Sequence, residues 1–296
     1  MNRTTQALLA ALAGAACLVS AAPASAQMMH VPDSDWRQPD RHDAIIRSAA
    51  TPNFMLELRL GPYLPNIDGS VPGGATPFQN IFGLNCNASP SPTIGAVSPR
   101  VLVGAEIDYL PLRIPYIGAV GPGVGWSFTS FSNNAQLANL TGPAYPNSQQ
   151  CSAETTTLTI MPMHGSFVLR ADELMRRTGV PIVPYGKVGA GVAWWRASTD
   201  TGTEKICGTA TAPTRCVGGA AVAGNGDGLT PSLHLAVGVM LSLNFLEPQA
   251  SARLDASTGV HHAYVFGEYY NDQLTLSTNV LHVGVSSFVG GLAVDF

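Results

Sequence analysis

The sequence predicts an all-β fold, a membrane-spanning, antiparallel, up-and-down β-barrel of eight strands. Three observations lead to this prediction. Charged residues make up 11% of the 296 residues, whereas soluble domains usually carry about 25%. Apolar and polar residues alternate in eight segments, which is typical of strands with one apolar face. After the N-terminus no apolar run reaches the length of about 18 residues that a membrane helix needs, so a closed sheet is the remaining way to cross a bilayer.

Composition also excludes two broad classes. An apolar content of 46% is too high for a mainly disordered chain. The formal net charge is -4 and no cluster of Lys and Arg is present, which argues against a nucleic-acid partner.

The first 26 residues resemble a secretory signal peptide. Arg3 gives a positive start, residues 7–22 are apolar, and Ala24, Ser25 and Ala26 are small residues of the kind that signal peptidase reads. Cleavage after Ala26 leaves 270 residues (296 minus 26). An uncleaved anchor and a lipoprotein modified at Cys17 are the alternatives. Residues 27–52 show no alternation and are interpreted as a periplasmic lead-in, so the barrel occupies residues 53–296.

The first four strands are predicted at residues 53–61, 101–109, 117–130 and 154–170. In each segment, alternate positions are mostly apolar, and the positions between them hold mainly charged residues, polar residues or glycine. The apolar positions are Phe54, Leu56, Leu58 and Leu60; Val101, Val103, Ala105, Ile107 and Tyr109; Val120, Val124, Trp126 and Phe128; and Met161, Met163, Phe167 and Leu169.

The last four strands are predicted at residues 183–195, 232–245, 262–270 and 280–296. Their alternating positions are Val188, Ala190, Val192 and Trp194; Leu233, Leu235, Val237, Val239, Leu241 and Leu243; Val265, Gly267 and Tyr269; and Phe288, Gly290, Leu292, Val294 and Phe296. Segments of this length suit a tilted membrane span, which needs about 9 to 11 residues. An even strand number places both ends of the sheet on one side.

The connections fall into two sets. The longer set comprises residues 64–99, 131–153, 197–231 and 271–279. The other set holds a tight turn at 111–115 and two short helices, at 171–179 and 248–259. The first helix has acidic residues early and Arg176 and Arg177 late, as the helix dipole favours. Outer-membrane barrels have long extracellular loops and short periplasmic turns. Ten strands remain an alternative, because residues 69–99 have room for a hairpin.

Four cysteines follow the signal segment, and all lie in the long connections. Their even number in an exported chain predicts two disulfides. Cys207 and Cys216 flank a turn at Pro213 and form the favoured pair, which leaves Cys86 with Cys151, although three connectivities are open. No spacing of Cys or His suggests a metal site, and no cofactor is predicted.

Charged residues share the strand face opposite to the apolar one. An eight-stranded barrel is filled by its own side chains, so we expect a buried network of ion pairs. A path for protons or small ions is the alternative. The predicted members are Glu57, Arg59, Glu106, Asp108, Lys187 and Glu268.

The chain ends with alternating apolar residues and a C-terminal Phe, which look like the signal read by the outer-membrane assembly machinery. The positions concerned are Phe288, Leu292, Val294 and Phe296. Aromatic residues near strand ends predict a membrane-interface girdle: Tyr109, Tyr116, Trp126, Trp194, Trp195 and Phe296.

The chain resembles a family of uncharacterised Gram-negative outer-membrane β-barrel proteins, known mainly from myxobacteria. The matching segments are LELRLGPYLPNID (56–68), RIPY (113–116) with GPGVGW (121–126), IMPM (160–163) and PIVPYGK (181–187). The resemblance covers most of the mature chain. It implies the fold and the location but no activity and no functional residues. Outer-membrane lipid, lipopolysaccharide, the barrel-assembly machinery and periplasmic chaperones are the partners expected at that location.

The leading functional hypothesis is a non-catalytic barrel that displays its loops for interaction or adhesion. One alternative is a lipid-A-modifying enzyme that uses His282 with Ser286 or Ser287 as base and nucleophile. Other histidines that raise this possibility are His164, His234, His261 and His262. A narrow channel is a second alternative. A soluble barrel with an interior ligand is a third, but it requires an apolar interior and a polar exterior. The sequence identifies no extracellular partner.

Overall fold

The computed structural model describes residues 53–71, 74, 76–88, 92–136, 151–209, 212–214, 222–273 and 281–296, and side chains at all of these except 70, 136, 205–209, 212–214 and 222–225. They belong to one compact unit, Pro39–Phe296. The predicted signal peptide and lead-in, residues 1–52, lie outside the described part.

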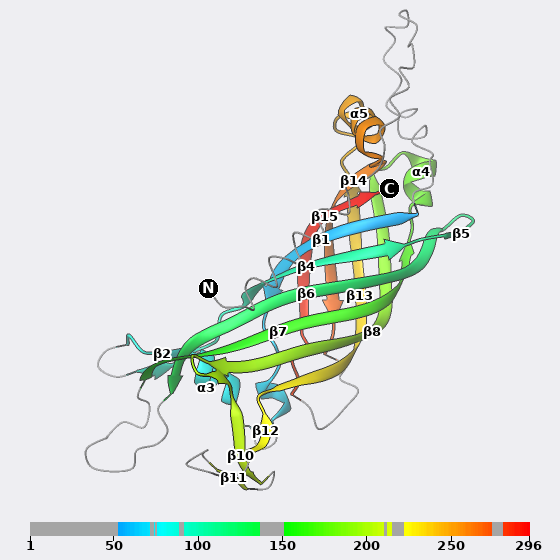
Figure 1. Cartoon of the computed structure of the whole chain (residues 1–296). Coiled ribbons are helices and arrows are strands. Elements are labelled where there is room, and N and C mark those ends of the chain that lie inside the picture. Colours follow the sequence, from blue (N-terminus) through cyan, green and yellow to red (C-terminus); the bar gives the residue numbers. More distant parts are fainter. Residues whose placement is uncertain are drawn as a thin grey trace, which may run out of the picture. The chain divides into compact units, whose positions relative to one another are not determined.

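Eight antiparallel strands form a closed barrel, as predicted (Figure 1). Each strand pairs with the next barrel strand along the chain, and the pairing of β15 with β1 closes the circle. The barrel is therefore an up-and-down barrel. Its strands are β1 (Phe54–Tyr63), β4 (Arg100–Tyr109), β6 (Gly118–Gln136), β7 (Cys151–Arg170), β8 (Ile182–Thr199), β13 (Asp227–Ser242), β14 (His262–Asn271) and β15 (Ser286–Asp295).

The closing seam joins the first and last strands in register. Leu58 lies opposite Leu292, and Arg59 lies opposite Gly291. At the end of the seam, the Phe296 N–H donates to the Phe54 carbonyl at 2.9 Å. We call this end of the barrel, where Phe54 and Phe296 meet, the terminal end. The opposite end is the loop end.

The additional strands do not enlarge the barrel to ten. β2 (Leu84–Asn85) and β3 (Thr93–Ile94) pair only with each other, so residues 69–99 hold a small hairpin outside the barrel. β5 (Leu112–Ile114) pairs antiparallel with the start of β6, and β9 (Gly202–Thr203) pairs antiparallel with the end of β8. β10 (Lys205–Thr209), β11 (Ala212–Thr214) and β12 (Val222–Asn225) form a separate three-stranded sheet.

Strands on one side of the barrel are longer than the alternation predicted. β6, β7 and β8 have 19, 20 and 18 residues, whereas β1, β4, β14 and β15 have 10 each. The extra residues at the loop end are largely Ser, Thr, Asn and Ala, which give no apolar alternation. β13 also begins at Asp227, inside a predicted connection, and β15 begins six residues later than predicted because residues 281–285 are not strand.

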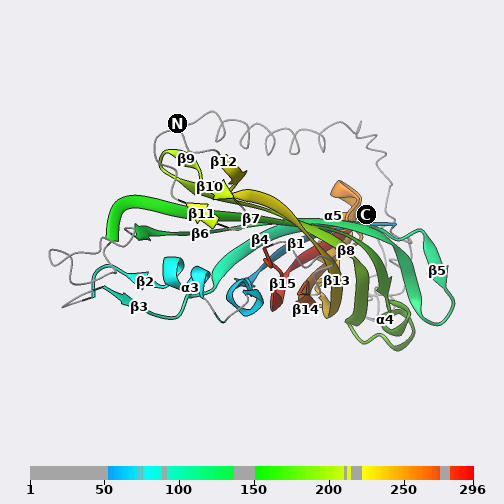
Figure 2. The same cartoon turned by 90° about the horizontal axis from the view of Figure 1, so that it is seen from below.

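Helices lie at both ends of the barrel. α4 (Glu173–Thr178) and α5 (Pro248–Thr258) confirm the two predicted helices. They lie at the terminal end, whereas α3 (Pro77–Phe82) lies at the loop end (Figures 1 and 2). A 3-10 turn, η1 (Asp68–Ser70), precedes α3. Gly179 and Gly259 end α4 and α5 with φ angles of 71° and 74°, a left-handed conformation that glycine adopts without strain. Among the described helices, none is long and apolar enough to span a membrane.

The barrel wall is apolar outside and polar inside. Val237, Leu58 and Phe167 are 63%, 56% and 52% exposed, and they belong to three different strands. Their polar neighbours along the strands, including Glu57 and Lys187, are buried. This distribution reverses that of a soluble barrel with an interior ligand.

Two apolar layers enclose a charged middle layer inside the barrel. The layer at the loop end contains Tyr63, Phe78 from α3, Phe131 and Val283. The layer at the terminal end contains Met55, Met240, Tyr264 and Phe266, and Met175 of α4 packs with them. The charged side chains between these layers form the candidate site.

Candidate functional site

Five charged side chains form a buried cluster in the middle of the barrel. We call it the central ion cluster, and it consists of Glu57, Arg59, Glu106, Lys187 and Glu268. They come from β1, β4, β8 and β14, and each is 4% exposed or less. Strand alternation explains the convergence, because every member occupies an inward position of its strand.

The two cations each contact all three carboxylates. Lys187 Nζ lies 2.8 Å from Glu57 Oε2, 3.0 Å from Glu106 Oε2 and 3.5 Å from Glu268 Oε2. Arg59 donates to Glu57 Oε2 at 2.8 Å, pairs with Glu106 Oε2, and lies 3.4 Å from Glu268 Oε1. Removing either cation leaves three buried carboxylates with a single counter-charge, which is strongly destabilising.

Asp108 lies beside this cluster but makes no ion pair with it. Its side chain is fully buried, and neither carboxyl oxygen accepts a hydrogen bond within the described part of the chain. Five of the six residues predicted for the network are thus brought together, and Asp108 stands apart. Its Oδ1 atom faces Gly123 of β6.

A pair of stacked histidines continues the polar interior towards the loop end. The rings of His164 and His234 are nearly parallel, at 8°, with centroids 3.8 Å apart. His164 Nε2 lies 3.3 Å from Glu106 Oε2, and His234 Nδ1 lies 2.7 Å from Asp272 Oδ1. Asp272 follows β14 at the loop end, so a polar chain connects that end with the central ion cluster.

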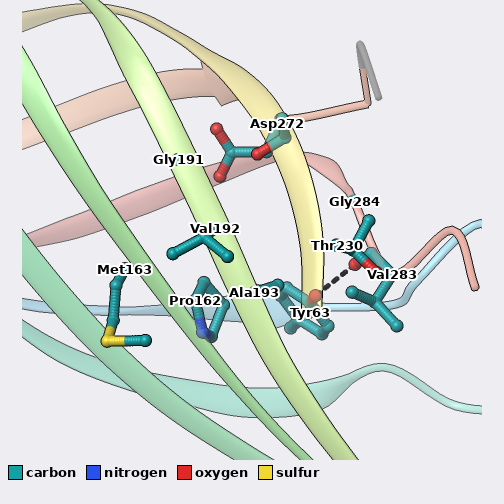
Figure 3. A pocket seen from close by; sticks show the side chains of 11 residues that line it. Tyr63, Pro162, Met163, Gly191, Val192, Ala193, Thr230, Asp272, Val283 and Gly284 are labelled. Carbon is teal, nitrogen blue, oxygen red and sulfur yellow. Dashed lines mark hydrogen bonds between the residues drawn. The ribbon is translucent and has the colours of Figure 1, made fainter. Parts of the chain in front are cut away.

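A small cavity lies beside this chain (Figure 3). Its volume is about 10 Å³, which is close to the room that one water molecule needs. Tyr63, Thr230, Ser232 and Asp272 contribute polar groups to its lining. The Tyr63 hydroxyl donates to the Val283 carbonyl, and Thr230 Oγ1 donates to the Leu281 carbonyl at 2.6 Å. The cavity is too small for a lipid or sugar substrate.

A second polar cluster closes the terminal end. Arg170 donates to Asp295 Oδ1 at 2.8 Å and lies 3.5 Å from Asp172, and Asp172 also pairs with Arg113 at 3.2 Å. The Tyr264 hydroxyl donates to Asp295 Oδ2 at 3.1 Å. These contacts connect β7, β14 and β15 to β5 and to Asp172, the residue that precedes α4.

Outside the strands, α4 contacts the neighbouring turn. Arg177 donates to Glu173 Oε1 at 2.9 Å, and this hydrogen bond holds the pKa of the Glu173 carboxyl below its usual range. The Arg177 guanidinium also lies 4.3 Å from the centre of the Tyr116 ring. Tyr116 is 76% exposed, so both side chains remain on the rim of the terminal end.

The cysteine predictions have different outcomes. A disulfide joins Cys86 and Cys151, whose Cα atoms are 5.9 Å apart. It ties the long connection 64–99 to the start of β7. The predicted partner pair, Cys207 and Cys216, lies outside the residues whose side chains the structure describes.

The C-terminal residues lie on the outer face of β15 and at its end. Phe288, Leu292 and Phe296 are exposed, and Val294 is half-buried. Tyr109, Trp126 and Tyr116 are also exposed, as a girdle requires. Trp195 differs, because it packs against the apolar layer at the loop end.

The residues considered for catalysis do not form a site. Ser286 bonds to the Tyr269 hydroxyl, and Ser287 donates to the Pro62 carbonyl at 2.7 Å. No hydrogen bond connects either serine with His282 among the described residues. His261 pairs with Asp255 of α5, and His262 lies 3.7 Å from Asp295. Within the described ranges, no three His, Cys, Asp or Glu side chains are arranged to hold a metal ion.

Sequence reasoning did not identify the histidine pair or the terminal-end cluster. The alternation of residues 154–170 already places His164 and Arg170 opposite Met163 and Leu169, hence on the inner face. His234 likewise alternates with Leu233 and Leu235. The missing information was strand register, since only register shows which inward side chains meet.

Comparison of the chain with models of protein families and with curated proteins finds no match.

Proposed function

We propose that the protein is a bacterial outer-membrane β-barrel that serves as a membrane anchor and presents its long connections at the cell surface. One observation carries this proposal: large apolar side chains face outward on every barrel strand, while the charged side chains away from the loop-end tips of these strands are buried inside. Soluble monomers rarely expose a contiguous apolar surface larger than a few hundred Å². A lipid bilayer is the environment that this surface fits.

The two ends of the barrel support an orientation in that membrane. The long connections, the Cys86–Cys151 disulfide and the extended strands β6 to β8 lie at the loop end. Disulfides form outside the reducing cytosol, and outer-membrane barrels place their long loops outside the cell. We therefore assign the loop end to the cell exterior, and α4 and α5 to the periplasm. The predicted signal peptide and the sequence resemblance agree with this address.

The alternative functions have less support. A channel requires a continuous aqueous path, whereas apolar layers fill the described interior on both sides of the central ion cluster. A lipid-modifying enzyme requires a nucleophile bonded to a base, whereas Ser286 and Ser287 bond to Tyr269 and Pro62 instead of a histidine. The proposed role is accordingly structural, with the loop end as the interacting surface.

Two arginine substitutions test the lipid-facing assignment. Val237→Arg places a charge at the middle of the outward face of β13, and we expect it to destabilise the membrane-inserted barrel by about 2–4 kcal/mol. Thr201→Arg adds the same side chain to the exposed turn before β9 and serves as the matched control, with no expected loss. The readout is the amount of folded protein in the outer-membrane fraction and its urea midpoint in lipid vesicles. Equal stability of the two variants, with Val237→Arg recovered as soluble protein, contradicts the proposal.

A further inference from the structure

The charge count inside the barrel is unbalanced. The central ion cluster has three carboxylates and two cations, and Asp108 adds a fourth carboxylate beside it. Within the described part of the chain, no Lys, Arg or His nitrogen lies within ion-pair distance of Asp108. A buried carboxylate without a counter-charge or hydrogen-bond donors is very costly, and such a group is usually neutralised.

The two oxygens of Glu106 have different surroundings. Oε2 accepts from Arg59 and lies 3.0 Å from Lys187 Nζ and 3.3 Å from His164 Nε2. Oε1 faces the other way, where the Ser166 hydroxyl donates to it at 3.4 Å. No cation contacts Oε1 among the described residues, so it remains available as an acceptor.

Asp108 meets Glu106 on that side. Gly123 of β6 provides the space: a Cβ at Gly123 would clash with Asp108 Oδ1 and would lie 3.0 Å from Ser166 Oγ and 3.1 Å from Glu106 Oε1. Asp108 Oδ1 and Glu106 Oε1 therefore border the same space beside Gly123, yet two ionised carboxylates have no hydrogen to share. This explains why neither Asp108 oxygen accepts a hydrogen bond although another polar group is adjacent.

We propose that Asp108 is a neutral carboxylic acid in the folded barrel and donates its hydrogen to Glu106 Oε1, so that the two carboxyls form a buried proton-binding site. The ligand of this site is a single proton. With this proton bound, Asp108 and the central ion cluster together have a net charge of -1 instead of -2. The titratable and charged groups that face the pair are Glu57 and Arg59 of β1, His164 of β7, Lys187 of β8 and Glu268 of β14.

Asp108→Asn tests this proposal, because an amide has nearly the shape of the acid and can donate to Glu106 without a proton from solution. An Asp in an unfolded chain loses its proton at about pH 4. If folded Asp108 keeps its proton, only the unfolded wild type releases it above pH 4. The ratio of the wild-type unfolding equilibrium constant to that of Asp108→Asn then rises about tenfold per pH unit. We therefore expect Asp108→Asn to be the more stable protein at pH 7 and equal to the wild type near pH 4, in urea unfolding of the full chain in detergent micelles.

Glu57→Gln is the matched control, since Glu57 accepts directly from Arg59 and Lys187. Its unfolding equilibrium constant at pH 7 should rise about tenfold or more, because charge-assisted hydrogen bonds from Arg59 and Lys187 are lost. An equally large rise in the unfolding equilibrium constant of Asp108→Asn would overturn the proposal, because it would mean that Asp108 is ionised and takes part in the ion pairs. A wild-type stability that increases with sodium concentration, in a manner abolished by Asp108→Asn, would also overturn it by identifying a bound cation.

Infrared spectroscopy gives a second readout that needs only the folded wild type. The expected result is a protonated-carboxyl band that persists at pH 7, where every ordinary carboxyl is ionised. Its absence at pH 7 contradicts the proposal, even if Asp108→Asn fails to fold.

Discussion

At the scale of single residues, glycines make the charged interior possible. A Cβ at Gly125 would contact the His164 ring, and one at Gly191 would lie 2.9 Å from Ser232 Oγ. Gly189 lies between Ser166 and His234 in the sheet. Large polar side chains therefore occupy inward positions that face glycines on the adjacent strand. Glycine has a steric role here that composition alone does not reveal.

The first residue-level prediction concerns Lys187. Lys187→Met removes the ammonium that contacts three buried carboxylates, so the free energy of unfolding should fall by about 3–5 kcal/mol. Ion conductance in planar bilayers should not change, because the described interior is packed on both sides of the cluster. Arg177→Met, on the exposed rim, is the control and should cost about 1 kcal/mol or less. A large conductance change with little loss of stability would instead favour an ion path.

A second residue-level prediction concerns the closing seam. A methyl group at Gly291 would clash with the Leu58 carbonyl oxygen on β1, a backbone atom that cannot move without disturbing the pairing. Gly291→Ala should therefore cost about 1–3 kcal/mol in urea unfolding. Gly165→Ala is the matched control on β7, because nothing lies within 4 Å of its added methyl. Equal stability of the two variants would contradict this account of the seam.

The candidate site was partly predictable from sequence for a physical reason. Alternation has a period of two, so it assigns Glu57, Arg59 and Lys187 to one face whatever the register. It does not say that Asp108 meets Gly123 while Glu106 meets the cations, because that depends on which residues of neighbouring strands lie opposite each other. The position of Asp108 beside Glu106 but outside the ion pairs of the cluster could be seen only in three dimensions.

At the scale of elements, the first long connection is fixed to the loop end of the barrel. Asp68 accepts from the Phe78 and Gln79 N–H groups at 2.7 and 2.9 Å, which orients α3. Asn133 of β6 donates to the Ile81 and Leu84 carbonyls at 2.9 and 2.8 Å. Phe78 then packs on Phe131 as part of the apolar layer. This connection acts as a cap and not as a free loop.

The element-scale prediction concerns the disulfide of this cap. Cys86 and Cys151 are 65 residues apart, and removing a crosslink over that separation should cost about 4 kcal/mol in the chain-entropy model. The double variant Cys86→Ser, Cys151→Ser should keep the barrel but become sensitive to chymotrypsin within residues 64–99. Mass spectrometry of the fragments locates the cleavage. The same protection in the double variant and the wild type would show that packing of α3 alone holds the cap.

Strand positions were predictable where one face is continuously apolar and less so where it is not. β1, β4 and β14 match their predicted segments within two residues at each end. The loop-end extensions of β6 beyond residue 130, of β7 before residue 154 and of β8 beyond residue 195 were missed. Neighbouring residues there, such as Asn133 with Asn134 and Ser198 with Thr199, are polar on both faces. Such strands are specified by backbone pairing with their neighbours and not by burial.

At the scale of the whole molecule, the barrel combines an apolar exterior, a packed interior and a charged middle layer. The stability of the interior depends on ion pairs that connect strands distant in sequence, such as Lys187 with Glu57 and Arg59 with Glu268. Between the two rims, the described exterior is mainly apolar. Both properties follow from one alternating pattern, and together they support the proposal of a membrane anchor with an interacting loop end.

An electrophoretic shift tests the central claim most directly. The outer-membrane fraction is run on SDS gels with and without boiling, alongside the soluble fractions. We predict that the protein is found in the outer-membrane fraction and migrates at a different apparent mass until boiling unfolds the closed barrel. Recovery of the protein in a soluble fraction, with no shift on boiling, would contradict the membrane assignment.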